Sequence, residues 1–343
     1  MVQNEVVVAQ RDAHTTRRSV AVTPTAKRSW GHWLICSLPL LALLLALGSQ
    51  QFVPDKQAFA TETVYPAFLK GLLALYIVAL IIAACWRAFE ARLRYLAPLL
   101  TVGCVLLLVW ELVTFRLDLL PLPYFPGPEK VIGYLLSDWQ LLAESAFYSL
   151  RLLFVGYFIG AAIGLVTGIA IGWKKHIHYW VMPLLKIIGP VPATAWIPLA
   201  LIVFPTSFWA SVFLIALAVW FPVAIMTSSG IANVRNAFFE VARTLGADQR
   251  YLIFKVAIPG AYPFIFIGLF MGLGGAFLTL IVAEMLGVKA GLGWYITWAQ
   301  GWAVYAKVYA ALIVIAVIFS SIITLLFTIR DRVLVWQKGV IKW

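Results

Sequence analysis

The chain has 343 residues, of which 63% are hydrophobic and only 12% are charged. Soluble domains average about 45–50% apolar and about 25% charged residues, so this composition excludes a water-soluble globule and a disordered chain. Three cysteines are too few for a disulfide-rich scaffold. The composition therefore indicates a multi-spanning membrane protein, and the formal net charge of +12 has to be explained by where the charges lie.

Apolar runs long enough to cross a membrane recur along the chain. A helix needs about 20 mostly apolar residues to cross the hydrocarbon core. We expect eight spans, at 30–48, 67–86, 95–114, 151–172, 180–203, 207–228, 259–283 and 305–328. The predicted fold class is thus an all-α, multi-pass membrane protein.

The charged residues separate by side of the membrane. With the N-terminus inside, 18 Lys and Arg fall in the segments that face the cytoplasm, against seven on the other side. These segments are 1–29, 87–94, 173–179, 229–258 and 329–343. Positive charge accumulates on the cytoplasmic side, so we predict that both termini lie inside. Because orientation accounts for the net charge, we expect no nucleic-acid partner.

The fourth span carries glycines at strict intervals of four residues, and the seventh span also carries closely spaced glycines. They are Gly156, Gly160, Gly164, Gly168 and Gly172, followed later by Gly268, Gly272 and Gly275. Glycine at this spacing removes the side chains from one helix face, which lets a second helix approach closely. We expect these glycines to pack helices within a bundle.

Prolines interrupt the fifth span. They are Pro183, Pro190, Pro192 and Pro198, and Pro205 follows directly. Proline removes a backbone donor, and irregular backbone at membrane depth persists only where it lines a cavity or is buried in protein. The pattern predicts a substrate pathway, with a kinked structural helix as the alternative. Lys186 in this span either attracts an anion or extends toward the cytoplasmic surface.

Chemistry-bearing side chains form no catalytic set. The four histidines lie in tails, loops or a span end, without a carboxylate or thiol group to complete a site, and no Gly-rich phosphate loop is present. Residues 130–143, between spans three and four, read as a short amphipathic helix on the outer surface. We therefore expect no enzyme and no cofactor bound by this chain.

The longest internal loop, 229–258, reads as two short helices joined by an elbow. The segment 236–245 has helical composition, and Gly246 is well placed to end that helix in a left-handed conformation. Asp248 can cap a second helix that runs to Lys255, and Pro259 then begins the next span. An apolar face of Phe238, Phe239 and Leu252 predicts a docking partner, with contact to the chain's own bundle as the alternative.

At this loop the chain resembles a known family. The string from Glu240 to Ala247, with Pro259 further on, resembles the EAA loop of ABC-transporter permeases, although Val241 replaces the first alanine. Further segments resemble the nitrate/sulfonate/taurine/bicarbonate group of these permeases: Pro126–Val131, Ser149–Arg151, Pro183–Leu199, and Ala283–Met285 followed by Gly291–Gly293. The chain departs from the group in two ways. It has Phe204-Pro205 where the group usually has F-G, and it has eight predicted spans where the group usually has six.

The resemblance implies a type I ABC importer permease fold in the bacterial inner membrane. It implies the transmembrane subunit of a binding-protein-dependent importer that moves a small anionic solute of the nitrate, sulfonate, taurine or bicarbonate class into the cytoplasm by alternating access. An aromatic vitamin precursor is the alternative solute. The implied partners are a second copy of the chain (a homodimer), two cytoplasmic ATPase subunits that bind ATP and Mg, an external substrate-binding protein, and membrane lipid.

The resemblance also assigns roles to residues of this sequence. The expected ATPase-coupling residues are Phe239, Glu240, Ala242, Gly246, Ala247 and Pro259. The expected pathway residues are Lys186, Pro190, Pro192, Thr194, Trp196 and Glu284. The expected organisation is a polar tail at 1–29, two additional spans at 30–94, and a six-span permease core at 95–343 with its coupling loop at 229–258.

Two other classes of membrane protein remain as alternatives. An ion-coupled secondary transporter or channel usually needs carboxylates or histidines at mid-membrane, and the predicted spans hold none there. An intramembrane enzyme needs a nucleophile with a base, or a metal site, and the sequence offers neither.

Overall fold

A computed structural model describes residues 30–52, 64–117, 119–120 and 122–335 of the chain. Over these residues every regular element is a helix, which confirms the predicted all-α class. The chain divides into two compact units, residues 1–117 and 118–343, and each is described by itself. The boundary between the two units follows Leu117 in the chain, whereas we predicted that the permease core begins at residue 95. The functional boundary at residue 95 stays a prediction.

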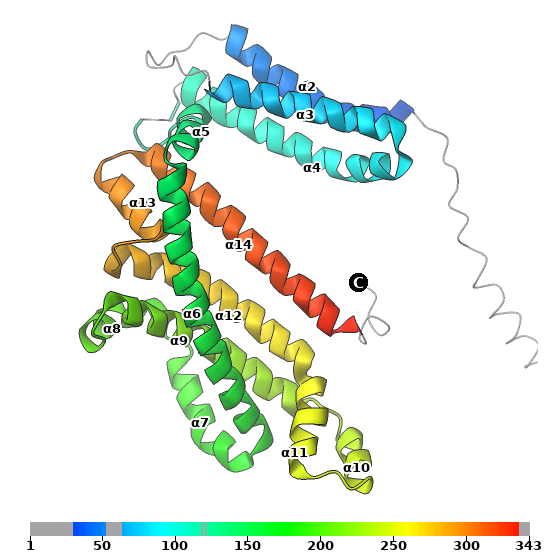
Figure 1. The fold of residues 1–343 in the computed structure, drawn as a ribbon, viewed down its shortest axis with the longest axis vertical. Coiled ribbons are helices and arrows are strands. Elements are labelled where there is room, and N and C mark those ends of the chain that lie inside the picture. Colours follow the sequence, from blue (N-terminus) through cyan, green and yellow to red (C-terminus); the bar gives the residue numbers. More distant parts are fainter. Residues whose placement is uncertain (1–29, 53–63, 118, 121, 336–343) are drawn as a thin grey trace, which may run out of the picture. The chain divides into compact units, whose positions relative to one another are not determined.

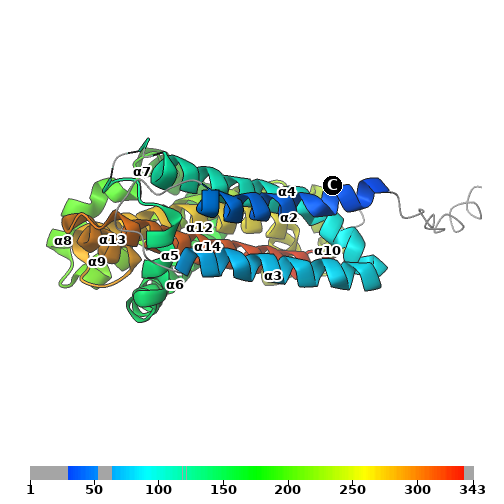
Figure 2. The same ribbon diagram turned by 90° about the horizontal axis from the view of Figure 1, so that it is seen from above.

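The first unit is a three-helix bundle of α2 (Trp30–Phe52), α3 (Val64–Cys85) and α4 (Arg87–Glu111), with α4 continued by the π-helical turn η1 (Leu112–Arg116). The three helices run side by side (Figures 1 and 2). The Tyr76 hydroxyl donates a 2.7 Å hydrogen bond to the buried backbone carbonyl of Cys36, which ties α3 to α2.

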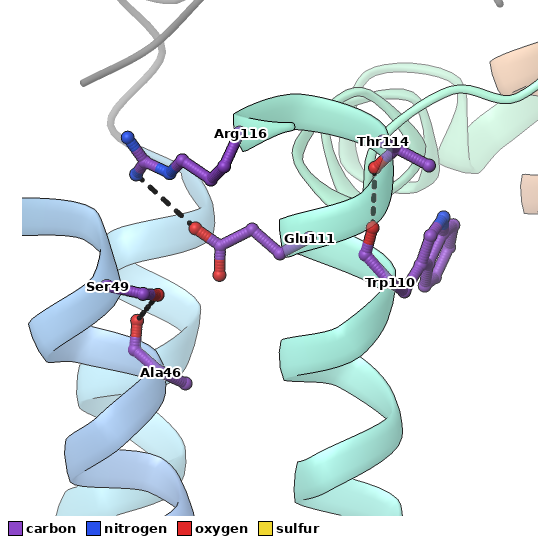
Figure 3. Close-up of polar contacts among 6 residues, drawn as sticks. All are labelled: Ala46, Ser49, Trp110, Glu111, Thr114 and Arg116. Carbon is purple, nitrogen blue, oxygen red and sulfur yellow. Dashed lines mark hydrogen bonds and ion pairs between the residues drawn. The ribbon is translucent and has the colours of Figure 1, made fainter. Parts of the chain in front are cut away.

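The far end of α4 holds a buried ion pair (Figure 3). Arg116 and Glu111 lie 3.4 Å apart, with side chains only 6% and 4% exposed. In the same turn, the Thr114 hydroxyl donates a 2.6 Å bond to the Trp110 carbonyl. A charge buried without its partner is costly, so each member of this pair depends on the other.

The second unit contains the remaining helices. In chain order they are α5 (Pro128–Ser137), α6 (Trp139–Trp173), α7 (Lys175–Ile188), η2 (Ala193–Trp196), α8 (Ile197–Val203), α9 (Ser207–Ala232), α10 (Asn236–Thr244), α11 (Gln249–Tyr251), η3 (Leu252–Ala257), α12 (Ile258–Gly287), α13 (Leu292–Gly301) and α14 (Tyr305–Val333). Within this unit, α10 and α13 lie at opposite ends (Figure 1).

The predicted spans are confirmed as elements. Among the described residues, seven helices are long and apolar enough to cross a membrane, and a bent helix pair makes an eighth if it counts as one span. Each overlaps one of the eight predicted runs. The fourth is longer than expected, because α6 begins at residue 139 and not at 151, and residues 139–143 belong to it and not to the surface helix. Asp138, with φ −98° and ψ 15°, interrupts the helical backbone there and separates α5 from α6.

Helix α9 forms the centre of the second unit, between α6 and α12. A Cβ added at any of the five stripe glycines of α6 would come within 3.0 Å of α9. At Gly160 it would lie 2.5 Å from the Ala216 carbonyl oxygen, which belongs to rigid backbone. The opposing residues of α9 also recur every four positions: Ile215, Val219, Val223, Thr227 and Ile231. Two four-residue ridges therefore pack face to face, as the glycine spacing predicts.

Candidate functional site: an exposed elbow and a broken span

The elbow has the predicted geometry at its turn. Helix α10 ends at Thr244, and Gly246 follows with φ +83°, a conformation that glycine adopts without strain. The Asp248 carboxylate accepts a 2.8 Å hydrogen bond from the backbone N–H of Tyr251, which caps the next helix as expected.

The second arm of the elbow is not a separate short helix. From Gln249 the backbone stays helical through α11, the π-helical turn η3 and α12 to Gly287. Pro259 therefore lies within one continuous helical segment and does not begin the span after a break. Proline lacks an N–H donor, and the widened π turn just before it lets the helix continue past the missing bond.

The apolar residues of the elbow separate into two faces. Phe239 packs toward the bundle, with its ring centroid 5.8 Å from that of Trp173 on α6, and Leu252 is only 1% exposed. The outward face consists of Phe238, Val241 and Leu245, which are 50%, 60% and 82% exposed. One face of the elbow therefore covers the chain's own bundle, and the other is exposed; the docking of a partner on the exposed face stays a prediction.

The other residues expected to couple to the ATPase lie on α10, in the turn that follows it and, for Pro259, at the start of α12. Glu240 and Gly246 are exposed, and Ala242, Ala247 and Pro259 are half-buried. Phe239 differs from the other expected coupling residues because its ring packs on Trp173 of α6. It therefore fixes α10 against the bundle and is not part of the exposed surface.

The fifth span is broken as the prolines predict. Helix α7 ends at Ile188, η2 and α8 resume at Ala193, and the two parts are bent by 85°. Pro190 and Pro192 occupy the gap, where neither can donate a backbone hydrogen bond. Pro183 lies inside α7 and Pro198 in the first turn of α8, where proline is tolerated.

A cavity of about 260 Å³ opens at this break. Helices α9 and α12 complete its wall opposite the gap between α7 and η2. The lining residues are Ile188, Gly189, Val191, Pro192, Ala193, Thr194, Leu217, Ala218, Phe221, Gly275, Leu278 and Thr279. Of the expected pathway residues, Pro192 and Thr194 belong to this wall. Thr279 was missed, since one threonine in an apolar span gives no distinguishing signal.

The remaining expected pathway residues lie outside the cavity wall. Lys186 and Pro190 are exposed, and neither is among the lining residues. Trp196 packs against the cluster of Ile197, Ala200, Ala210, Leu214 and Ala283. Their roles in transport stay predictions.

Glu284 lies in a different place, as a buried bridge between three helices. It is 1% exposed, and its Oε2 atom accepts hydrogen bonds from the Ser149 hydroxyl on α6 (3.0 Å) and the Gly293 N–H on α13 (2.8 Å). Ser149 in turn accepts a 2.8 Å bond from the Leu292 N–H. Gly291 has φ +115°, and a Cβ there would meet the Glu284 carboxylate. The S-L-R, A-E-M and G-L-G segments of the sequence thus form one polar contact.

A second polar cluster fixes the same end of the unit. The Asp138 carboxylate lies 2.8 Å from the Lys307 ammonium and accepts a 2.9 Å bond from the Tyr295 hydroxyl. Partial burial acts to raise the pKa of Asp138, but the hydrogen bonds and charge of its partners outweigh burial and hold that pKa below its ordinary value. Burial and the bond to Asp138 raise the pKa of Tyr295. The three residues are too far apart in the chain for sequence spacing to pair them.

The comparisons with known proteins agree with this geometry. The family profile described as "Binding-protein-dependent transport system inner membrane component" matches residues 160–334, which include the broken span and the elbow. The chain belongs to this family. It is therefore a multi-pass permease of the inner membrane that is not itself catalytic, and an ATPase and a binding protein work with it. This assignment replaces the secondary-transporter and intramembrane-enzyme alternatives.

Three relatives show where the permease lies within the family. A putative ABC transporter permease of Methanocaldococcus jannaschii is 30% identical over 67% of this chain and 88% of its own length. The taurine transport permease TauC of Escherichia coli is 32% identical over 60% of this chain and 79% of its own. The nitrate import permease NrtB of Synechococcus elongatus is 26% identical over 60% and 77%. These matches confirm the predicted resemblance to the taurine and nitrate group.

Proposed function

We propose that the permease moves a small anionic solute of the taurine, sulfonate, nitrate or bicarbonate class into the cytoplasm by alternating access. The names of the taurine and nitrate relatives support this class. The observation that carries the proposal is the pairing, in one compact unit, of an exposed apolar elbow with a bent span that opens a cavity. An aromatic vitamin precursor stays the alternative solute.

The elbow has the connections that a coupling device needs. An ATPase that binds the outward face of α10 would move α12 directly. Only the four residues Leu245–Asp248 separate α10 from the continuous helical segment Gln249–Gly287, which contains α12. It also moves α6 through the contact between Phe239 and Trp173. Since α9 is packed tightly between α6 and α12, these helices would turn together as a rigid group.

The assembly we propose contains two copies of this permease, two ATPase subunits and one external binding protein. ATP binding would close the ATPase pair, and the two elbows would carry that motion to the spans. The translocation pathway would then run between the two copies, with the broken fifth spans beside it. Glu240, Ala242, Gly246 and Ala247 are proposed to contact the ATPase, together with Leu245.

Substitution of the elbow surface tests this proposal. Leu245→Asp places a charge on an 82% exposed apolar side chain and should leave the fold intact while preventing ATPase binding. The measurements are co-purification of the ATPase in mild detergent and uptake of labelled taurine into cells. Val333→Asp is the matched control, because Val333 is an exposed valine (41%) at the end of α14.

We expect the Leu245→Asp permease to reach the membrane in normal amount but to purify alone and to lose uptake, while Val333→Asp behaves as the unmodified protein. A permease that purifies without an ATPase before any substitution would refute the proposal.

A further inference from the structure

The cavity at the break of the fifth span has a wall without a charged side chain. Ten of its twelve lining residues are apolar or glycine, and the only polar side chains among them are Thr194 and Thr279. Lys186, the nearest basic residue along the chain, is exposed and outside the wall. An anion of low carbon content would therefore rest here without a fixed counter-charge, which is unfavourable in an apolar environment.

The two threonine hydroxyls are free to bind a guest. Threonines inside helices usually donate to the carbonyl four residues earlier, and Thr167, Thr244, Thr297 and Thr324 do so here at 2.8 to 3.2 Å. In the part of the chain that the structure describes, neither Thr194 nor Thr279 has a side-chain hydrogen bond to another residue. Thr279 lies one helical turn beyond Gly275, so both face the cavity from the same side of α12.

The size of the cavity also favours an organic guest. An apolar cavity of about 150 Å³ is enough to hold one benzene molecule. The 260 Å³ available here leaves room for a body of several carbon atoms next to Phe221 and Leu278. An inorganic oxyanion of four atoms would contact only a small part of this apolar wall, so the wall would contribute little to its binding.

We propose that this cavity is a resting site for the transported solute and that it selects a solute with an apolar body of several carbon atoms and a hydrogen-bond-accepting head, in preference to a bare inorganic oxyanion. This inference rests on the proposed function and narrows its solute class. The apolar wall contacts the body, while Thr194 and Thr279 donate to the head.

The first test fills the cavity. Gly275→Val adds a branched side chain to the wall, and its Cβ would make an ordinary van der Waals contact, 3.4 Å from the Ala218 carbonyl oxygen. Gly274→Val is the matched control, since Gly274 is the adjacent residue of the same helix, has nothing within 4 Å and lies outside the wall. The probes are methane-, butane- and hexanesulfonate, taurine and nitrate, taken up by proteoliposomes that contain the whole transporter.

We expect Gly275→Val to lower uptake of butane- and hexanesulfonate by about tenfold. One methylene group in excess of what an apolar pocket can hold has an effect of about this size. Uptake of methanesulfonate should fall much less, and Gly274→Val should change none of the rates. Equal loss for every chain length, or no loss for any, would overturn the inference.

The second test removes one of the two hydroxyls with little change in the shape of the side chain. Thr279→Val should raise the KM for butanesulfonate about threefold to tenfold, the range for one lost hydrogen bond. Thr324→Val on α14 is the control, because its hydroxyl bonds to Ser320 and lies outside the wall.

The outcomes separate this inference from the proposed function. Nitrate transported as the preferred solute, with no response to Gly275→Val or Thr279→Val, would overturn the inference and leave the importer intact. No ATP-dependent uptake of any probe, with the ATPase and binding protein present, would overturn the proposed function and the inference with it.

Discussion

Glu284 and Asp138 show how single carboxylates join helices that are distant in the chain. Glu284 connects α12 with Ser149 of α6 and Gly293 of α13. Asp138 connects the start of α6 with Tyr295 of α13 and with Lys307 of α14. Each gives α13, a helix of only ten residues, a polar anchor that its own length does not provide.

The Asp138–Lys307 pair predicts a pH-dependent stability. Because the folded pKa of Asp138 is lowered, the pair stabilises the fold above the unfolded pKa of about 3.9 and loses that contribution as pH falls through the folded value. Asp138→Asn should therefore cost about 2 kcal/mol near pH 7, the range for a hydrogen bond to a charged group. The measurement is the thermal midpoint in detergent between pH 3 and pH 7. The gap between the two proteins should narrow toward pH 3, and a gap independent of pH would contradict the assignment.

At the scale of elements, the glycine stripe decides how closely α6 and α9 approach. Gly160→Ala forces a methyl group against the Ala216 carbonyl, and backbone cannot move aside as a flexible side chain would. We expect a loss of about 1–3 kcal/mol, the usual effect of overpacking, seen as a lower thermal midpoint and less folded protein on size exclusion. Gly103→Ala on α4 is the control, with nothing within 4 Å of the added methyl. Equal behaviour of the two variants would mean that the two helices are not in close contact.

At the scale of the whole molecule, the alternation of the spans gives a topology that labelling can test. The positive-inside pattern places Arg243 on the cytoplasmic side and Lys289 outside. In a protein with Cys36, Cys85 and Cys104 replaced by Ser, a membrane-impermeant maleimide added to intact cells should label Lys289→Cys and spare Arg243→Cys until the membrane is opened. The reverse pattern would show that the orientation is inverted.

The sequence alone determined the features that are local in the chain. Span length and apolar content identified the eight spans, four-residue glycine spacing identified the tight helix face, and clustered prolines located the break at residues 189–192. The left-handed turn at Gly246 and the Asp248 cap followed from the same short-range rules. Each depends on a backbone preference that acts over a few residues.

Only the tertiary structure decided which residues meet across the bundle. Three residues illustrate this: Phe239 packs on Trp173, Glu284 fastens α13, and Thr279 joins Thr194 at the cavity. Phe239 and Trp173, like Thr279 and Thr194, are tens of residues apart in the chain, and Glu284 also bonds to Ser149, which is more than a hundred residues away. An apolar span offers many equivalent positions of each residue type. Sequence periodicity fixes which face of a helix is free of bulk, but the packing of whole helices against one another fixes which side chain reaches which neighbour.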